Sequence, residues 1–254
     1  GVLLSRARAI GATHVATGHY ARIGRRGATW TLHRAREAGK DQAYTLHRLD
    51  QEQLGAALFP LGGVESKSDV RLEAARLELV SAAKPDSQEL CFVDGDLSKE
   101  LSRRLAGRFR PGPIVDARGR ILGEHRGLPF YTVGQRSRLD LRPGRPDAGP
   151  LYVLELDAAS NRVVVGPVEA LQRRRLAAGD CRWVGGAPPE AGLEVEAQLR
   201  AHGRAHPARV AAASSRTVEL IFAEPAGQVS PGQAAVLYRG DEVIGGGVVT
   251  EAGR

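Results

Sequence analysis

The strongest constraint on the fold is a series of short alternating segments in the last third of the sequence. Apolar and polar residues alternate over residues 194–200, 208–212, 217–221, 234–238 and 242–249. A period of two places successive side chains on opposite faces of a strand. Turns with glycine or proline separate the segments, so we predict a C-terminal β-barrel domain over residues 173–254.

The N-terminal region has the pattern of an α/β unit. A helix is predicted over residues 2–10, ending at Gly11, and a short strand over residues 13–17 follows it. The loop Gly18-His19-Tyr20 comes directly after this strand, at the position where open α/β sheets bind ligands. No strand precedes the helix, so the sequence starts in the middle of such a unit and we expect an N-terminal truncation. A hairpin is predicted over residues 21–34.

Capping boxes predict two further helices. Asp50 pairs with Gln53 in one box and Ser66 with Asp69 in the other, each at the spacing that satisfies free backbone donors at a helix start. The second helix extends to about residue 79, and we expect one of its faces to be buried. The residues expected on that face are Val70, Ala74, Ala75 and Leu77.

Positive charge is concentrated in the middle of the chain. The net charge is +7, and residues 99–150 alone hold 12 basic and 5 acidic side chains, which accounts for the whole excess. Of the 36 basic residues 32 are arginines, which can contact phosphate with two donors at once. This segment predicts a polyanionic partner such as a nucleic acid, and a solvated basic surface is the alternative.

Few cysteines and no long apolar run limit the class of protein. No segment approaches the ~18 apolar residues of a membrane span, and no signal peptide opens the sequence, so we expect a cytoplasmic location without membrane contact. The two cysteines, Cys91 and Cys181, make neither a disulfide framework nor a zinc site, and no metal ligands are predicted. From its apolar neighbours alone, Cys91 is more typical of a core residue than of a nucleophile. Cys181 is interpreted as structural.

Seven motifs together resemble one known family. They are ATGHYAR, KDQAY, FPLGG, PDSQELCFV, GEHRGLPFYTVGQR, YVLELD with NRVVVG, and SPGQAAVLY with GGGVV. In this order, and over nearly the whole chain, they resemble the bacterial tRNA-specific 2-thiouridylases. The resemblance implies an α/β plus β fold with three parts. These are the remnant of a doubly wound adenine-nucleotide-hydrolase-like domain (1–97), a small, mostly β central tRNA-binding domain (98–172) and a C-terminal β-barrel (173–254).

The resemblance also implies a reaction and a set of site residues. In that family ATP, with Mg²⁺, adenylates the C2 oxygen of the wobble uridine of tRNA, and a cysteine persulfide loaded by a sulfur-relay protein delivers the sulfur. The persulfide maps to Cys91 and an ATP contact to Gly18, in a protein expected to be a monomer. The expected tRNA-binding residues are His19, Lys40, Asp41, Gln42, Arg200, Ala201 and Gln233.

The sequence departs from the family pattern in three places. A glycine- and serine-rich phosphate loop and a second catalytic cysteine are absent, so we expect that this chain alone cannot adenylate tRNA. Ala201 stands where the family commonly has an aromatic residue, which affects the contact expected at Arg200 and Ala201. Two alternatives therefore stay open, a tRNA-binding remnant without catalysis and a generic basic β-barrel protein.

Overall fold

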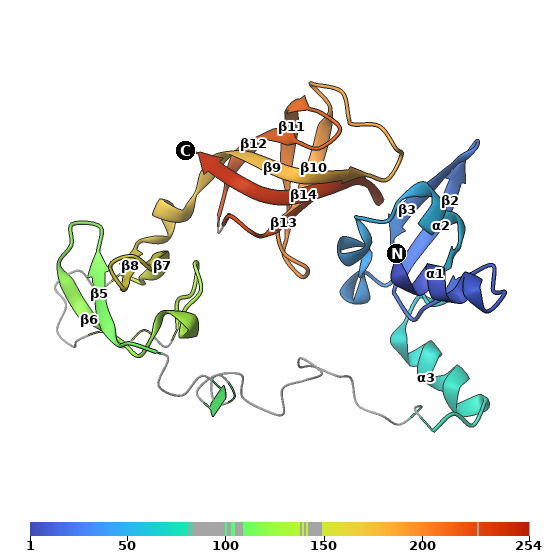
Figure 1. Cartoon of the computed structure of the whole chain (residues 1–254), viewed down its shortest axis with the longest axis horizontal. Helices are drawn as coiled ribbons and strands as arrows, with labels where there is room; N and C mark the ends of the chain where they lie inside the picture. Colours follow the sequence, from blue (N-terminus) through green and yellow to red (C-terminus); the bar gives the residue numbers. More distant parts are fainter. Residues whose placement is uncertain are drawn as a thin grey trace. The chain divides into compact units, whose positions relative to one another are not determined.

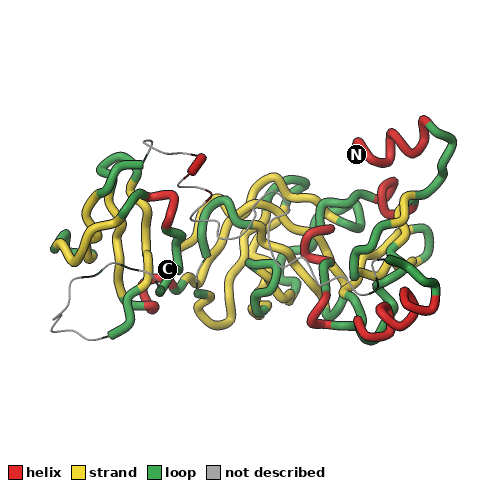
Figure 2. Tube along the Cα trace, turned by 90° about the horizontal axis from the view of Figure 1, so that it is seen from below, coloured by secondary structure: helices red, strands yellow, loops and turns green. Residues whose placement is uncertain are grey.

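The computed structural model describes residues 1–80, 82, 100, 103–104, 109–137, 139, 141, 149–227 and 229–253. Within this part of the chain strands predominate over helices (Figure 2). The chain forms two compact units, one that joins Gly1–Lys84 with Arg173–Arg254 and one that spans Pro85–Gln172. The division into three domains at residues 97 and 172 stays a prediction. Among the described residues, no helix is long and apolar enough to cross a membrane.

The C-terminal half of the first unit is a closed, six-stranded antiparallel barrel (Figure 1). The strand order is β13-β10-β11-β12-β9-β14, and pairing of β13 with β14 closes it. The predicted β-barrel is thus confirmed. Its strands are β9 (Arg173–Trp183), β10 (Glu194–Gln198), β11 (Ala205–Ala213), β12 (Val218–Ala226), β13 (Ala234–Arg239) and β14 (Glu242–Gly253).

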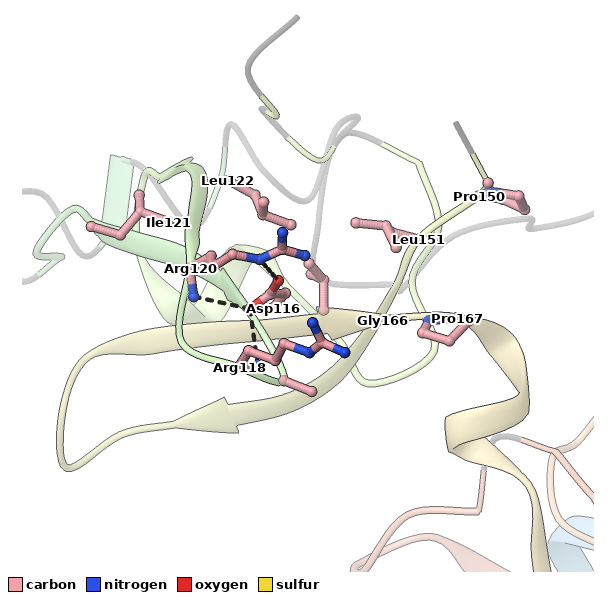
Figure 3. Close-up of a pocket in the computed structure, with 12 residues that line it drawn as sticks. Asp116, Arg118, Arg120, Ile121, Leu122, Pro150, Leu151, Gly166 and Pro167 are labelled. Atoms are coloured by element: carbon pink, nitrogen blue, oxygen red, sulfur yellow. Dashed lines mark hydrogen bonds and ion pairs between the residues drawn. The ribbon is translucent and has the colours of Figure 1, made fainter. Parts of the chain in front are cut away.

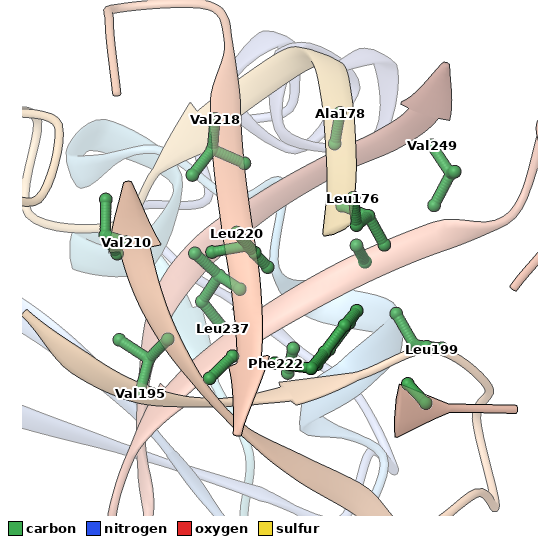
Figure 4. Close-up of a cluster of buried hydrophobic side chains, with 14 of the residues drawn as sticks. Leu176, Ala178, Val195, Leu199, Val210, Val218, Leu220, Phe222, Leu237 and Val249 are labelled. Atoms are coloured by element: carbon green, nitrogen blue, oxygen red, sulfur yellow. The ribbon is translucent and has the colours of Figure 1, made fainter. Parts of the chain in front are cut away.

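Alternation along these strands fills the barrel with apolar side chains. Leu220, Phe222 and Leu237 are fully buried, and Figure 4 shows them among the side chains clustered in the core. Burying each such side chain contributes roughly 1.5–3 kcal/mol to folding. Cys181 belongs to the same core, where burial and the Asp180 carboxylate raise the pKa of its thiol to about 11. A neutral, buried thiol agrees with the structural role expected for Cys181.

A hairpin from the N-terminal region extends the barrel sheet. Strands β2 (Ala21–Arg26) and β3 (Thr29–Arg34) pair around Gly27, and β3 pairs in turn with β14 through Leu32 and Val243. One apolar cluster therefore draws on both ends of the chain, and its members include Ala21, Leu32, Leu54, Val236 and Tyr238. The hairpin was predicted, but its attachment to the barrel was not.

The described α/β element is small. Helix α1 (Val2–Ala9) leads to strand β1 (Val15–Ala16), which pairs in parallel with β4 (Ala57–Leu58). Helix α2 (Gln51–Gly55) starts with the predicted capping box of Asp50 and Gln53, which is confirmed. The 3₁₀ turns η1 (Ala38–Lys40) and η2 (Ala43–Leu46) connect β3 to this helix.

Helix α3 (Lys67–Arg76) corrects one prediction. Ser66 accepts a hydrogen bond from the backbone of Asp69, as its capping position requires, yet no residue of the helix is buried. Ala75 and Leu77, expected on a buried face, are exposed, while Val70 and Ala74 are half-buried. The capping signal is local and is obeyed, whereas burial needs an apolar surface of another element against the helix, which the sequence pattern alone does not supply.

The second unit is a small four-stranded sheet in the order β6-β5-β8-β7, with β5 and β8 parallel. Its core contains Ile114, Val153 and Val163, all fully buried. The predicted mostly β character of this segment is confirmed. Its elements are β5 (Gly112–Asp116), β6 (Ile121–His125), η3 (Leu128–Phe130), β7 (Tyr152–Asp157), β8 (Arg162–Gly166) and η4 (Val168–Leu171).

Candidate nucleic-acid interface

The loop after β1 is held against the segment around Gln42. The Gln42 side-chain oxygen accepts a hydrogen bond from the backbone N–H of Tyr20 at 3.0 Å, and the Gln42 N–H donates to the Tyr20 carbonyl at 2.8 Å. Two bonds from one residue to one backbone unit fix the position of both segments. His19, the residue before Tyr20, is therefore close to Gln42, although the two motifs are more than twenty positions apart in sequence.

Asp41 acts as the organising acceptor of this loop. Its carboxylate accepts hydrogen bonds from the backbone of Ala35 at 2.9 Å and of Ala43 at 3.2 Å, and it forms an ion pair with Arg34 at 3.1 Å. Only 8% of the Asp41 side chain is exposed. The carboxylate thus shapes the loop that carries its neighbours, half-buried Lys40 and exposed Gln42.

Arg34 connects this loop to the barrel. Its guanidinium donates to the Asp41 carboxylate and, at 3.0 Å, to the side-chain oxygen of Gln198 at the end of β10. The same group lies 3.6 Å from the ring centroid of fully buried Tyr238, which is a cation–π contact. Such desolvated, multiply bonded guanidinium groups fix the relative position of the elements they join.

Gln198 continues this connection to the turn after β10. Its side-chain amide donates to the carbonyl oxygens of Arg200 at 2.9 Å and of Ala201 at 3.0 Å. The predicted contact segments around Asp41 and around Arg200 are therefore joined by one chain of hydrogen bonds. We call this set the Arg34 network; it consists of the hydrogen-bonded residues Asp41, Arg34 and Gln198, together with Tyr238, whose ring contacts Arg34.

The predicted residue Gln233 lies near the same region. The Tyr44 hydroxyl donates to the carbonyl of Ala234 at 3.0 Å, one residue beyond Gln233. Gln233 closes its own turn, because its side-chain oxygen accepts from the backbone of Ser230 at 3.2 Å. Burial raises the pKa of Tyr44, and the cation of Arg200 partly opposes this, so Arg200 acts on Tyr44 electrostatically.

His19 lines a small apolar cavity of about 190 Å³, and Gly18, the predicted ATP contact, is not among its lining residues. Thr17 shares a hydrogen bond of 2.8 Å with Nδ1 of His19, and the His19 ring meets the edge of Phe59 at 5.9 Å. The lining suits a flat apolar ring such as a base, whereas its described residues include no lysine or arginine that could balance a triphosphate. Gly18 is exposed, and a methyl group there would meet only Leu61, at 3.8 Å.

Two larger cavities are lined by basic residues. Arg200 and Ala201 line one of about 510 Å³ at the turn between β10 and β11. The other, about 600 Å³, lies in the second unit, where Figure 3 shows Arg118 and Arg120 beside Leu122 and Leu151. In that cavity Arg120 is neutralised by an ion pair with Asp116 at 2.6 Å.

The predicted persulfide residue Cys91 and its motif at residues 85–93 lie outside the described residues. Arg34 and Gln198 were not among the site residues predicted from the sequence. No sequence signal marks Gln198, because alternation along β10 places it on the face opposite to buried Ala197, yet it is only 4% exposed. None marks Arg34 either, whose partners are defined by contacts distant in sequence.

Comparison with known proteins gives matches over nearly the whole chain. Family profiles match residues 1–95 (tRNA methyl transferase HUP domain), 99–167 (tRNA methyl transferase PRC-barrel domain) and 173–249 (aminomethyltransferase beta-barrel domain). The tRNA-specific 2-thiouridylase MnmA of Heliobacterium modesticaldum is 47% identical over 97% of this chain and 64% of its own length. Proteins of the same name from Chloroflexus aggregans and Roseiflexus castenholzii are 48% and 44% identical, each over 96% of this chain and over 67% and 69% of their own lengths. The chain thus spans about two thirds of the length of these relatives, and it belongs to the tRNA-specific 2-thiouridylase family.

Proposed function

We propose that this chain takes part in the ATP-dependent 2-thiolation of the wobble uridine of tRNA, with Cys91 carrying the sulfur. One observation supports the tRNA-binding part most directly. His19, Gln42 and Arg200, expected from the motifs to contact tRNA, come from separate parts of the sequence and are joined by the Gln42–Tyr20 bonds and the Arg34 network. A random set of surface residues has no reason to share one hydrogen-bonded framework.

In this proposal the substrates are ATP, with Mg²⁺, and tRNA, and a sulfur-relay protein supplies the persulfide. Adenylation turns the C2 oxygen of uridine into a leaving group, and the terminal persulfide sulfur then attacks C2 as a soft nucleophile while AMP departs with that oxygen. A second thiolate must then attack the Cys91 sulfur and break the S–S bond, which releases 2-thiouridine and leaves a disulfide on Cys91. The cysteine that supplies this thiolate in the family is absent from the sequence, so the second thiol would have to come from outside this chain. The uridine must leave the anticodon stack to react. His19, Gln42 and Gln233 would contact the RNA, while Asp41 and Arg34 hold their segments in place.

The first experiment locates the sulfur. The full chain is treated with a cysteine desulfurase and L-cysteine, alkylated and mapped by mass spectrometry. We expect a persulfide on Cys91 and none on Cys181, because Cys181 is buried and its thiol stays protonated at neutral pH. The variant C91A should lose the persulfide and C181A should keep it. A persulfide that survives C91A contradicts the role of Cys91.

A second measurement separates binding from catalysis. A tRNA transcript with a wobble uridine is titrated against the chain, and tRNA-dependent release of pyrophosphate from ATP is followed in parallel. We expect binding without pyrophosphate release by the chain alone. Clear tRNA-dependent release would refute the expectation that this chain cannot adenylate tRNA unaided. Binding of tRNA without any persulfide on Cys91 would favour a binding module over an enzyme.

A further inference from the structure

The cavity at the turn between β10 and β11 gathers four basic side chains. Arg200, His202, Arg204 and His206 all line its volume of about 510 Å³. Arg200, Ala201 and His202 follow Gln198, the last residue of β10, and His206 is the second residue of β11. Only Arg200 belongs to the residues expected from sequence, so the other three enlarge the site.

None of these four residues has an anionic partner within the described part of the chain. No ion pair joins any of them to a carboxylate, although several arginines of the same unit are paired, such as Arg48 with Asp180 at 2.6 Å. Arg22 and Arg26 of the same unit are likewise each paired with a carboxylate. Basic side chains that line a cavity without acidic partners create a positive potential there, which attracts anions.

The arginines of this cavity affect the pKa values of two neighbouring groups, His206 and Tyr44. Burial lowers the pKa of His206, and the cation of Arg204 lowers it further. The cation of Arg200 acts in the same sense on Tyr44, where it opposes the effect of burial. Arg200 and Arg204 thus each act electrostatically on a titratable group near them.

The cavity is built on fixed elements. Gln198 holds the carbonyl oxygens of Arg200 and Ala201, which sets the path of the turn. The His206 ring packs edge-on against Phe222 of β12 with centroids 6.1 Å apart. Ala201 contributes only a methyl group, so this position offers no ring on which a base could stack. The chemistry of the cavity is therefore that of charge neutralisation.

We propose that this cavity binds a backbone phosphate of tRNA, with Arg200 and Arg204 as its main ligands and His202 and His206 completing it. The inference rests on the proposed function and specifies how the barrel takes hold of the RNA. Two arginines can each offer paired N–H donors to phosphate oxygens. Through Gln198, the site is connected to the Arg34 network, so the bound phosphate would lie in fixed register with the loop of Gln42.

The first arm of the test uses inorganic phosphate as the probe. The histidine ring signals of the full chain are recorded by NMR during a phosphate titration at constant ionic strength, with H206Q and H202Q to assign them. We expect the His202 and His206 signals to shift and those of His14 and His33, which lie outside the cavity, to stay. Unchanged His202 and His206 signals overturn the proposal.

The second arm uses a tRNA transcript and matched arginine variants. At 0.1 M salt, loss of one phosphate contact should weaken binding about tenfold and reduce the slope of log K against log salt by about 1. We expect this of R204Q. The control R209Q removes the same charge from exposed Arg209 of β11, outside the cavity, and should change the affinity less than about twofold. Arg204 is exposed and without an ion pair, so its variant should fold normally, and H206Q gives an independent change in the same cavity.

The outcomes separate the two claims. Equal weakening by R204Q and R209Q, or none by R204Q and H206Q, overturns the assignment to tRNA even if phosphate shifts the histidine signals. Absence of tRNA binding by the wild-type chain overturns the proposed function, and the phosphate titration then decides alone whether the cavity binds the anion. Histidine shifts together with a selective loss in R204Q support both.

Discussion

Arg34 and Arg204 lie at the two ends of one connected region, yet their surroundings are opposite. Arg34 is three-quarters buried and binds a carboxylate, an amide and an aromatic ring. Arg204 is exposed on the rim of a cavity, and no carboxylate of the described chain pairs with it. An arginine that pairs with groups inside the protein holds the elements of the fold together. An arginine beside a cavity that has no acidic partner is available to a ligand.

The second unit also contains arginines that are paired with carboxylates. Residues 99–150 carry the entire net charge, but three of the described arginines in this segment already share two carboxylates. Arg103 and Arg104 both pair with Glu100, and Arg120 pairs with Asp116. A charge count along the sequence therefore locates basic segments without saying which guanidinium groups are available. Ion pairing within the fold decides this. The turn between β10 and β11, outside the basic segment 99–150, holds two arginines and two histidines that pair with no carboxylate of the described residues.

The largest expected effect comes from breaking the Arg34 network. The variant R34Q leaves the Asp41 carboxylate, 8% exposed, without its cation and removes a partner of Gln198. We expect a loss of about 2–3 kcal/mol in the free energy of unfolding, below the full cost of breaking a buried pair because water reaches Arg34 in part. Urea unfolding measures it, and R34K should recover part of the loss by keeping the charge.

The matched control for R34Q is R8Q. Arg8 pairs with Glu52 at the surface, where both side chains are more than half exposed. Exposed pairs contribute little, so R8Q should change the free energy of unfolding by less than about 1 kcal/mol. If both variants lost the same stability, Arg34 would be an ordinary surface cation and its contrast with Arg204 would disappear.

A smaller effect is expected from D116N in the central unit. Burial alone would raise the pKa of Asp116, but hydrogen bonds from the Arg120 side chain and from the backbone of Arg120 and Arg118 hold it below its usual value. A lowered folded pKa gives stability that is present above the unfolded pKa and is lost as pH falls through the folded pKa. D116N should therefore have a lower urea midpoint than the wild type at neutral pH. The difference between the two midpoints should be smaller in acid.

The acid comparison needs only two conditions, about pH 6 and about pH 3, with the same variant. A gap of the same size at both pH values would mean that the lost hydrogen bonds do not depend on the charge of Asp116. In that case the ion pair with Arg120 would not be what neutralises this cavity, and the contrast between the two basic cavities would weaken.

The sequence predicted what depends on local pattern. Alternation located the strands of the barrel because a strand with one buried face must repeat every two residues. The box at Asp50 and Gln53 marked a helix start because its hydrogen bonds span three residues. Pairing of β3 with β14 was not predictable in this way, since Leu32 and Val243 meet across most of the chain. Register between distant strands follows from tertiary packing.

In the candidate site, too, local motifs predicted some residues, whereas others are identified only by tertiary contacts. Motifs located His19, Gln42, Arg200 and Gln233, because a family resemblance transfers positions one by one. The groups that join those positions, Arg34 and Gln198, are defined by contacts distant in sequence and carry no motif. The basic residues from Arg200 to His206 are close together in the sequence, but only the fold shows that they line one cavity.

The smallest expected effect is a pH dependence that separates the cavity from the rest of the interface. Burial and Arg204 lower the pKa of His206, so its ring is neutral near pH 7; Arg200 and His202 share the cavity, and Phe222 adds only an uncharged ring. A bound phosphate favours the imidazolium, so tRNA affinity should rise as pH falls from about 7.5 to 5.5, by roughly threefold. H206Q should reduce this rise, whereas R209Q, which lies outside the cavity and removes no imidazole, should retain it. A rise that survives H206Q unchanged would assign the proton to another group, and His206 would then be a packing partner of Phe222 instead of a phosphate ligand.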